Sequence, residues 1–188
     1  MNATINRMPE NINFLTDIKF SLSIQRLKDV QYFCQSVNIP GCYTPPVDQG
    51  TPYIPQKLQG DTLHYSPFKV SFLVDEYLNN YWSIYKWKKG ITFPDSYSQY
   101  KALVTAGNRP DFGELYSDIT LNILSNKQIP ICMVHFKECW PSRLDDLNFT
   151  TTRSDEDPIQ CSVEFAFTSF DYEQLFPVEG VGSAENVL

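Results

Sequence analysis

Residues 61–90 constrain the fold most, because two structural periods meet there. Between positions 68 and 74 the apolar residues recur at every second position, as in a strand with one buried face. After Asp75 the apolar positions follow helical spacing instead. The sequence therefore predicts a strand that runs directly into a short helix. The face of this helix that is expected to be apolar carries Leu78, Tyr81, Trp82 and Tyr85.

Both ends of this helix are marked in the sequence. Asp75 is a favourable N-cap residue, and Gly90 suits the position just after a helix C-terminus. Apolar residues cover well over half of the helix circumference, which is more than one packed face requires. Two interpretations follow. The helix either lies deep in the core of one domain, or packs on its own sheet on one side and on a neighbouring subunit on the other.

The composition is that of a globular chain. With 188 residues, 42% hydrophobic and 14% aromatic, residues 1–188 are expected to form a single domain. Most other segments show strand patterns, so the predicted class is mainly β, a β-sandwich or barrel with one main α-helix. Thirteen prolines predict long, constrained loops. The net charge of −7 argues against a protein that grips nucleic acid, because such proteins need a basic surface.

The remaining elements are predicted from alternation and turn residues. A hairpin with its turn at residues 28–29 is expected near the N-terminus, and a second hairpin has its turn at residues 125–128. Trp140-Pro141 is expected to end the return strand of the second hairpin. A second helix is predicted at residues 96–105. The expected strands are residues 19–27, 30–37, 115–124, 129–139 and 159–170.

Residues 42–60 hold four prolines and two glycines, so they cannot form a central strand. Their apolar side chains are nevertheless too many for a loop that only meets solvent. Such a loop either packs on its own domain or reaches to a neighbour as an arm. The tail, residues 174–188, is expected to be flexible. The apolar residues of the arm include Tyr43, Val47, Tyr53 and Ile54.

No sequence motif indicates catalysis, a cofactor or a metal. The sequence has no G-x-S-x-G, P-loop, H-E-x-x-H or G-x-G-x-x-G motif, and its two histidines leave little for acid–base chemistry. Cys132, His135 and Cys139 have a ligand-like spacing, but on a regular strand Cys132 would face away from the other two. The five cysteines are expected to be reduced thiols of a protein made in the cytoplasm. Neither a secretory signal in residues 1–13 nor a transmembrane helix is recognisable.

The order of the motifs resembles a known protein family across residues 20–172. A strand with a Val-Asp-Glu ending enters a tryptophan-containing helix, and a Cys-Trp-Pro turn precedes the last strand. This arrangement is similar to the tail tube proteins of contractile-tailed, T4-like bacteriophages. The segments that carry the resemblance are residues 33–35, 38–41, 60–61, 68–76, 82–87, 136–141 and 163–167.

The resemblance implies a structural virion protein. Subunits of this family form hexameric rings that stack into a tube, through which DNA passes without specific binding, inside a contractile sheath. The implied partners are further copies of the chain, the sheath, and baseplate or neck proteins, and the implied location is the virion tail after assembly in the host cytoplasm. Tube-initiator, baseplate-junction and tail-terminator proteins of the same fold remain alternatives. A carbohydrate-binding β-sandwich is a rival from another class, suggested by the many aromatic residues.

Two sets of residues are predicted to serve assembly. The arm and the aromatic helix are expected to contact neighbouring subunits, and the polar faces of two long strands are expected to line the channel. An acidic channel would let DNA slide, because phosphate would be repelled. The predicted interface residues are Tyr43, Val47, Tyr53, Ile54, Tyr77, Tyr81, Trp82 and Tyr85. The predicted lumen-facing residues are Asp118, Thr120, Asn122, Ser162, Glu164 and Thr168.

Overall fold

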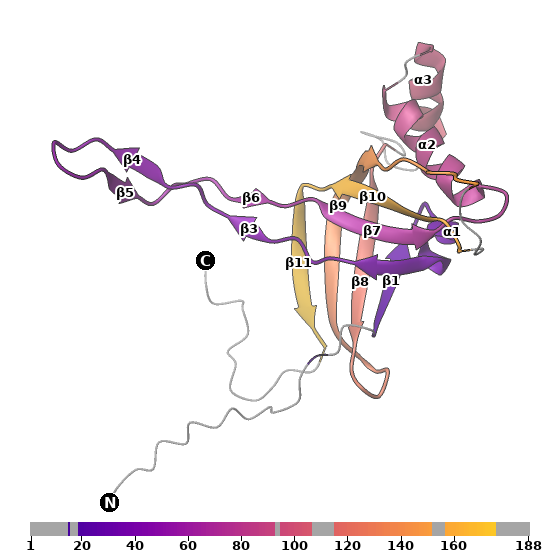
Figure 1. Cartoon of the computed structure of the whole chain (residues 1–188), viewed down its shortest axis with the longest axis horizontal. Helices are drawn as coiled ribbons and strands as arrows, with labels where there is room; N and C mark the ends of the chain where they lie inside the picture. Colours follow the sequence, from indigo (N-terminus) through magenta and orange to yellow (C-terminus); the bar gives the residue numbers. More distant parts are fainter. Residues whose placement is uncertain (1–14, 16–18, 93–94, 107–114, 152–156, 176–188) are drawn as a thin grey trace, which may run out of the picture.

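Alternating strands build the molecule, and a long hairpin leaves it at one end (Figure 1). The computed structural model describes residues 15, 19–92, 95–106, 115–151 and 157–175. The helices are α1 (Lys28–Tyr32), α2 (Asn79–Thr92) and α3 (Tyr97–Ala106). The strands are β1 (Phe20–Ile24), β2 (Cys34–Val37), β3 (Cys42–Tyr43), β4 (Val47–Gln49), β5 (Gln56–Leu58), β6 (His64–Tyr65), β7 (Phe68–Leu73), β8 (Ser117–Leu124), β9 (Pro130–Leu144), β10 (Gln160–Ala166) and β11 (Ser169–Gln174). None of the helices in these ranges is long and apolar enough to cross a membrane.

Seven strands form one bent antiparallel sheet in the order β1-β8-β9-β10-β7-β2, with β11 paired to β9. The long strand β9 belongs to both halves of this sheet. We call β1, β8, β9 and β11 half-sheet A, and β9, β10, β7 and β2 half-sheet B. The strands of the two halves cross at a large angle in Figure 1, as in orthogonal sandwiches whose corners are made by strands that change sheets. The predicted mainly β class is confirmed.

The corner lies at a β-bulge in β9. The register of β8 against β9 shifts between Ser117 and Ile119, and Glu138 adopts a left-handed φ of 55°. The extra residue bends the strand and reverses which side chains face inward. Cys139 is therefore buried, on the same side as Cys132, whereas regular alternation predicted opposite sides. Trp140-Pro141 does not end the strand as expected, because β9 continues past the bend into half-sheet B.

The core lies between the two half-sheets. Phe68 and Phe136 stack at its centre with ring centroids 4.3 Å apart, and Phe165 lies 6.3 Å from Phe68. The predicted alternation is confirmed over most of β8 and β10, where buried apolar residues alternate with half-buried polar ones, although Ile123 is only half-buried. Fully buried members of these strands are Ile119, Leu121, Val163 and Phe165.

The predicted N-terminal hairpin is wrong. A short helix, α1, separates β1 from β2, and the two strands lie at opposite ends of the strand order. The N–H of Gln31 donates to the carbonyl of Leu27 over 3.1 Å, and this helical turn directs both Leu27 and Val30 into the core. Burying these two residues, three positions apart, requires a helical turn and not a strand.

The predicted C-terminal strand, residues 159–170, is two strands. β10 pairs with the part of β9 beyond the bulge, and β11 pairs with the part before it. The break falls at residues 167–168, where Phe167 and Phe170 pack with Phe136 over 5.3 and 5.6 Å. Gln174 belongs to β11, so the expected flexible tail does not begin there, and residues 176–188 lie outside the described ranges.

Helix α2 starts and ends later than predicted: it spans Asn79–Thr92, whereas the sequence placed its N-cap at Asp75 and its end before Gly90. The chain first makes a turn in which Leu78 has a φ of 60° and donates its N–H to the carbonyl of Asp75 over 2.8 Å. Gly90 is no C-cap. It lies inside α2, where its missing side chain lets Leu103 of α3 approach closely. The predicted second helix is confirmed, with α3 shifted by one residue.

Candidate assembly surfaces

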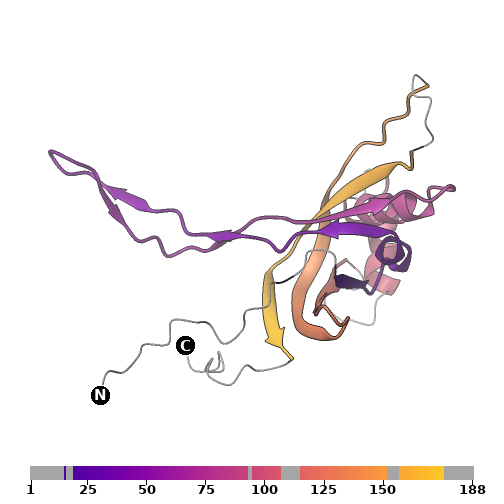
Figure 2. The ribbon, with the colours of Figure 1, turned by 60° about the horizontal axis from the view of Figure 1, so that its bottom comes forward.

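The arm is the outer part of one long hairpin that begins and ends in the sheet. Strand β2 pairs with β7, β3 with β6 and β4 with β5, so the two halves of the hairpin remain side by side from residue 34 to residue 73. Figures 1 and 2 show this hairpin leaving the sandwich and extending far from it. Tyr53 is 95% and Ile54 75% exposed, so the tip does not pack on its own domain. The inter-subunit contact of residues 42–60 stays a prediction.

Aromatic packing fixes the base of the arm to the sandwich. The ring centroid of Tyr65 lies 5.5 Å from that of Phe167 and 5.3 Å from that of Phe170, at the corner between β10 and β11. Further out, the rings of Tyr43 and His64 stack at 5.2 Å. The arm is therefore held in a set direction at its base, although its tip is free of the domain.

Gly60 lets the two halves of the arm hairpin approach each other. A Cβ atom at this position would lie inside the van der Waals contact distance of the carbonyl oxygen of Pro45 on the opposite chain. Only glycine lacks a Cβ atom, so the close pairing of the two halves of the arm depends on Gly60.

The aromatic face of α2 is turned outward, which excludes the interpretation that the whole helix lies deep in the core of one domain. Trp82 is 46% and Tyr85 41% exposed, and their rings meet edge to face at 5.2 Å. Tyr77, in the turn before the helix, is also exposed, whereas Tyr81 is half-buried. The buried face instead carries Ile84 and Trp87. Apolar residues thus cover two sides of α2, as the interpretation with a neighbouring subunit requires.

Asn80 sets this rotation of α2. Its Nδ2 donates to the carbonyl of Leu73 at the end of β7 over 2.7 Å, and its Oδ1 accepts the N–H groups of Asp75 (3.3 Å) and Tyr81 (2.8 Å). The fully buried amide thus satisfies the backbone where β7 ends and α2 begins. Sequence reasoning missed this residue, because hydrophobic spacing does not mark a buried polar side chain.

Trp87 joins α2 to the core. Its Nε1–H donates to the carbonyl of Leu115 over 3.0 Å, its ring centroid lies 6.1 Å from that of Phe165, and the guanidinium of Arg26 lies 5.1 Å from the ring centroid. The side chain is 1% exposed. The helix is therefore anchored through one tryptophan and offers the other to solvent.

The predicted lumen residues of β8 lie on the outer face of half-sheet A. The hydroxyl of Thr120 lies 3.1 Å from Nδ1 of His135, and Asp118 accepts the N–H of Glu138 over 3.1 Å. Thr168 donates to the carboxylate of Glu138 over 2.8 Å at the corner. Asn122 lies further along the same strand. This face is acidic among the described residues, because Lys137 is outnumbered there by Asp118, Glu138, Asp171 and Glu173.

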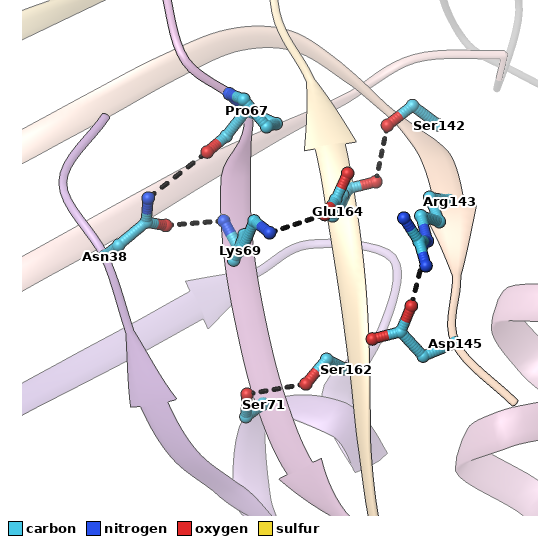
Figure 3. A network of polar contacts seen from close by, with 9 residues as sticks. All are labelled: Asn38, Pro67, Lys69, Ser71, Ser142, Arg143, Asp145, Ser162 and Glu164. Atoms are coloured by element: carbon cyan, nitrogen blue, oxygen red, sulfur yellow. Dashed lines mark hydrogen bonds and ion pairs between the residues drawn. The ribbon is translucent and has the colours of Figure 1, made fainter. Parts of the chain in front are cut away.

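The other two predicted lumen residues lie on half-sheet B (Figure 3). The hydroxyls of Ser162 and Ser71 are 2.8 Å apart, and Lys69 forms a 2.7 Å ion pair with Glu164. This hydrogen-bonded pairing with Lys69 lowers the pKa of Glu164 below its ordinary value. The six predicted lumen residues therefore do not form one strip, since they lie on two crossing half-sheets.

Two free strand edges of half-sheet A complete the candidate surfaces, and among the described strands β2, which pairs only with β7, is a further edge on half-sheet B. Among the described strands, β1 pairs only with β8, and β11 pairs only with β9. Half-sheet A thus has an unpaired edge on each side, and such edges offer backbone N–H and C=O groups to another chain.

Nothing in the described ranges assembles a metal site, since no group of three or more His, Cys, Asp or Glu side chains converges there. Cys132 and Cys139 face the core, whereas His135 lies on the outer face. The geometry offers surfaces for protein contacts: an exposed arm, an exposed aromatic helix face and free strand edges.

Comparison with known proteins identifies the family. No protein-family model matches the chain. A relative from Enterobacteria phage T4, a tail tube terminator protein, is 33% identical over 144 residues, which cover 74% of this chain and 76% of the relative. The chain belongs to the tail tube terminator family. The predicted resemblance to the tail tube proteins of contractile-tailed phages is thereby confirmed.

Solved structures share the fold of this family member. The tube-terminating cap of the anti-feeding prophage aligns with a TM-score of 0.58 and 11% identity, covering 91% of this chain and 99% of the cap. The sheath/tube terminator of PVC, an extracellular contractile injection system, in its extended state aligns with a TM-score of 0.51 and 10% identity, covering 87% and 99%. The similarity to the phage T4 tail tube terminator favours the tail-terminator alternative over the main hypothesis of a tube subunit.

Proposed function

We propose that this chain is a non-enzymatic structural protein of a contractile phage tail, where it ends the tail tube. The observation that carries the proposal is the family membership, at 33% identity over three quarters of both chains. The protein would be assembled in the host cytoplasm and reside in the virion tail. Its partners would be further copies of itself, the last ring of the tube, and sheath or neck proteins.

The free edges of half-sheet A support ring formation. The strands β1, β8, β9 and β11 are antiparallel to their neighbours, so β1 and β11 run in opposite directions. Joining β11 of one copy to β1 of the next therefore continues the antiparallel pattern. Such a contact uses two different surfaces and closes into a ring when the rotation between copies is right. We propose that hexamers form in this way.

Such a ring would enclose a passage lined by the outer face of half-sheet A. The acidic groups there, including Asp118 and Glu138, would repel DNA phosphates and prevent binding during passage. In this arrangement Asp118, Thr120 and Asn122 face the passage, and Ser162 and Glu164 on half-sheet B do not. Asp118→Lys should leave ring formation intact and slow DNA release from virions, whereas Glu164→Lys serves as the matched control with release at the wild-type rate.

The arm would bind the last ring of the tube. The base of the arm lies beside β11, whereas its tip beyond β4 and β5 lies far from both sheet edges that would join copies within a ring (Figure 1). Tyr53 and Ile54 at the tip offer the apolar and aromatic groups that anchor protein interfaces. Replacing both with serine should leave the ring intact and abolish attachment to the tube.

Elongation of purified tubes tests the proposal. Tube protein that is polymerising in vitro receives the terminator, and electron microscopy records the distribution of tube lengths. We expect elongation to stop and a ring to appear at one tube end. The Tyr53→Ser/Ile54→Ser variant should not stop elongation. Copies of the chain distributed along the tube wall would contradict a terminator and favour a tube subunit.

A further inference from the structure

A cavity of about 690 Å³ opens beside the free edge of β1, between β1, α1 and β2. One wall is apolar and belongs to β1, where Phe20 and Leu22 point to the core side of half-sheet A. The opposite wall is polar, because α1 and β2 line it with Lys28, Gln31 and Gln35. A cavity with these two walls suits a side chain that has an apolar body and a polar tip, such as tyrosine.

The hydrogen bonds of β1 show which of its backbone groups face the free edge. The carbonyl of Lys19 accepts the N–H of Leu124 over 3.0 Å, so the odd-numbered residues of β1 direct their backbone groups to β8. The N–H of Ile24 points to the other side, where Oε1 of Gln31 accepts it over 3.3 Å. The backbone groups of β1 that remain open to another strand are therefore those of Phe20 and Leu22.

Strand β11 presents matching groups at the opposite edge of half-sheet A. The N–H of Leu175 donates to the carbonyl of Ile131 over 3.0 Å, so the odd-numbered residues of β11 direct their backbone groups to β9. The even-numbered residues face the free edge, and their side chains lie on the core side, where Phe170 packs on Phe136. Residues opposite each other in an antiparallel pair point to the same side of the sheet. When β11 joins β1 of the next copy, Tyr172 must therefore lie on the side of the cavity.

Tyr172 is exposed although it lies on the core side of the sheet. Its partner in β9 is Val134, which is buried, and its side chain is hydrogen-bonded to Cys132, which is also buried. The tyrosine is nevertheless 62% exposed, because it belongs to the last strand on this side. Neighbouring strands lie about 4.8 Å apart, so β1 of a second copy would bring the apolar wall of its cavity directly beside this ring.

The charges of β11 favour β1 over a second β11 as its partner. Asp171 and Glu173 project from β11 on the outer face of half-sheet A. Two β11 strands joined edge to edge would set the carboxylates of two copies against each other, and like charges directly opposite each other are destabilising. Strand β1 presents only hydroxyl groups on that face, from Ser21 and Ser23.

We propose that Tyr172 of one copy enters the cavity between β1, α1 and β2 of the next copy, with its ring against Phe20 and Leu22 and its hydroxyl toward the polar wall. This inference rests on the proposed function, because it needs the contact of β11 with β1 in a ring. Strand pairing supplies main-chain hydrogen bonds, and the inserted side chain selects the register. A shift by one residue would turn Tyr172 to the outer face and leave the cavity empty.

Mixing two defective variants tests the proposal. Tyr172→Ala removes the inserted side chain, and Gln35→Trp fills the cavity from β2. Both positions are exposed, so circular dichroism should show both variants folded. In sedimentation velocity, each variant alone should need at least about a tenfold higher protein concentration to form rings. Tyr97→Ala of α3 is the matched control, since Tyr97 is 64% exposed, and should form rings at the wild-type concentration.

The mixture distinguishes a contact between two different surfaces from a general loss of assembly. At a concentration at which each variant alone is monomeric, the equimolar mixture should form dimers and no rings. The Gln35→Trp copy still donates its Tyr172, and the Tyr172→Ala copy still offers an open cavity, so one contact is restored for each pair.

Disulfide trapping determines the register. Ser21→Cys is combined in turn with Asp171→Cys and with Glu173→Cys, in a chain that also carries Cys42→Ser. One of the two pairs lies opposite in each register that places Tyr172 in the cavity beside Phe20 or Leu22. We expect that pair to give a ladder of disulfide-linked species that ends at the closed ring, whereas Ser21→Cys alone should give no ladder.

The outcomes separate this inference from the proposed function. Rings that tolerate Tyr172→Ala, a mixture that stays monomeric or closes into rings, or rings that neither cysteine pair links would overturn the inference alone. A wild-type chain that forms no ring would contradict the proposed ring contact and this inference together. Rings that assemble as described but do not stop tube elongation would contradict only the terminator role.

Discussion

Replacement of Trp87 by phenylalanine tests which side of α2 holds the domain together. Trp87 is 1% exposed, and its Nε1–H donates to the carbonyl of Leu115 over 3.0 Å. Phenylalanine keeps an aromatic ring in contact with the core but removes the donor and part of the volume. Trp82 lies on the same helix at 46% exposure, so Trp82→Phe is a matched control.

The expected loss of stability follows from two contributions. Leaving the largely buried carbonyl of Leu115 without a donor costs about 1–3 kcal/mol. The smaller ring leaves about 40 Å³ unfilled, which at about 24 cal/mol per Å³ adds about 1 kcal/mol. We therefore expect Trp87→Phe to lower the free energy of unfolding by about 2–4 kcal/mol. Trp82→Phe should change it by less than about 0.5 kcal/mol, as most surface substitutions do.

Urea unfolding followed by circular dichroism at 222 nm measures both values without relying on tryptophan fluorescence. The comparison is made at a protein concentration at which both variants and the wild type sediment as the same species. If Trp82→Phe cost as much as Trp87→Phe, the assignment of the buried face to Trp87 and Ile84 would be refuted. The face with Trp82 and Tyr85 would then be the one that packs on the domain.

Three further predictions use single positions. Gly60→Ala should separate the two chains of the arm, so that trypsin cleaves the arm faster while the melting temperature of the core is unchanged; unchanged cleavage would contradict the close approach. Gly90→Ala should destabilise the domain by about 1–3 kcal/mol through overpacking against α3, and adding Leu103→Ala should recover part of that loss. Burial raises the pKa of Cys139 to about 12, so its thiol should resist alkylation at pH 8 until unfolding, whereas exposed Cys42 should react at once.

The strands with one buried face could be predicted from the sequence, because their alternation is a local signal. Ile119, Leu121, Val163 and Phe165 all point inward as expected. The same signal does not report where a strand bends. The bulge at Glu138 and the break at residues 167–168 depend on how the two half-sheets cross, which is a property of the whole fold.

The errors near the helices have a different cause. Spacing identified an amphipathic helix, but aromatic residues occupy two of its sides, and the buried side was decided by the amide of Asn80. Likewise, the burial of Leu27 and Val30 turned an expected strand into a helical turn. The protruding arm could be anticipated from its prolines and apolar side chains, whereas its pairing with β7 through one continuous hairpin could not.

The copy number and place of this chain in the tail test the central claim most directly. Cryo-electron microscopy of intact tails, with quantitative mass spectrometry of the chain relative to the tube protein, gives both. A tube terminator predicts a single ring at one end of the tube, with the tips of the arms in contact with the last ring of the tube. A chain that recurs in every ring along the tube, or that is absent from the tube end, would contradict the account.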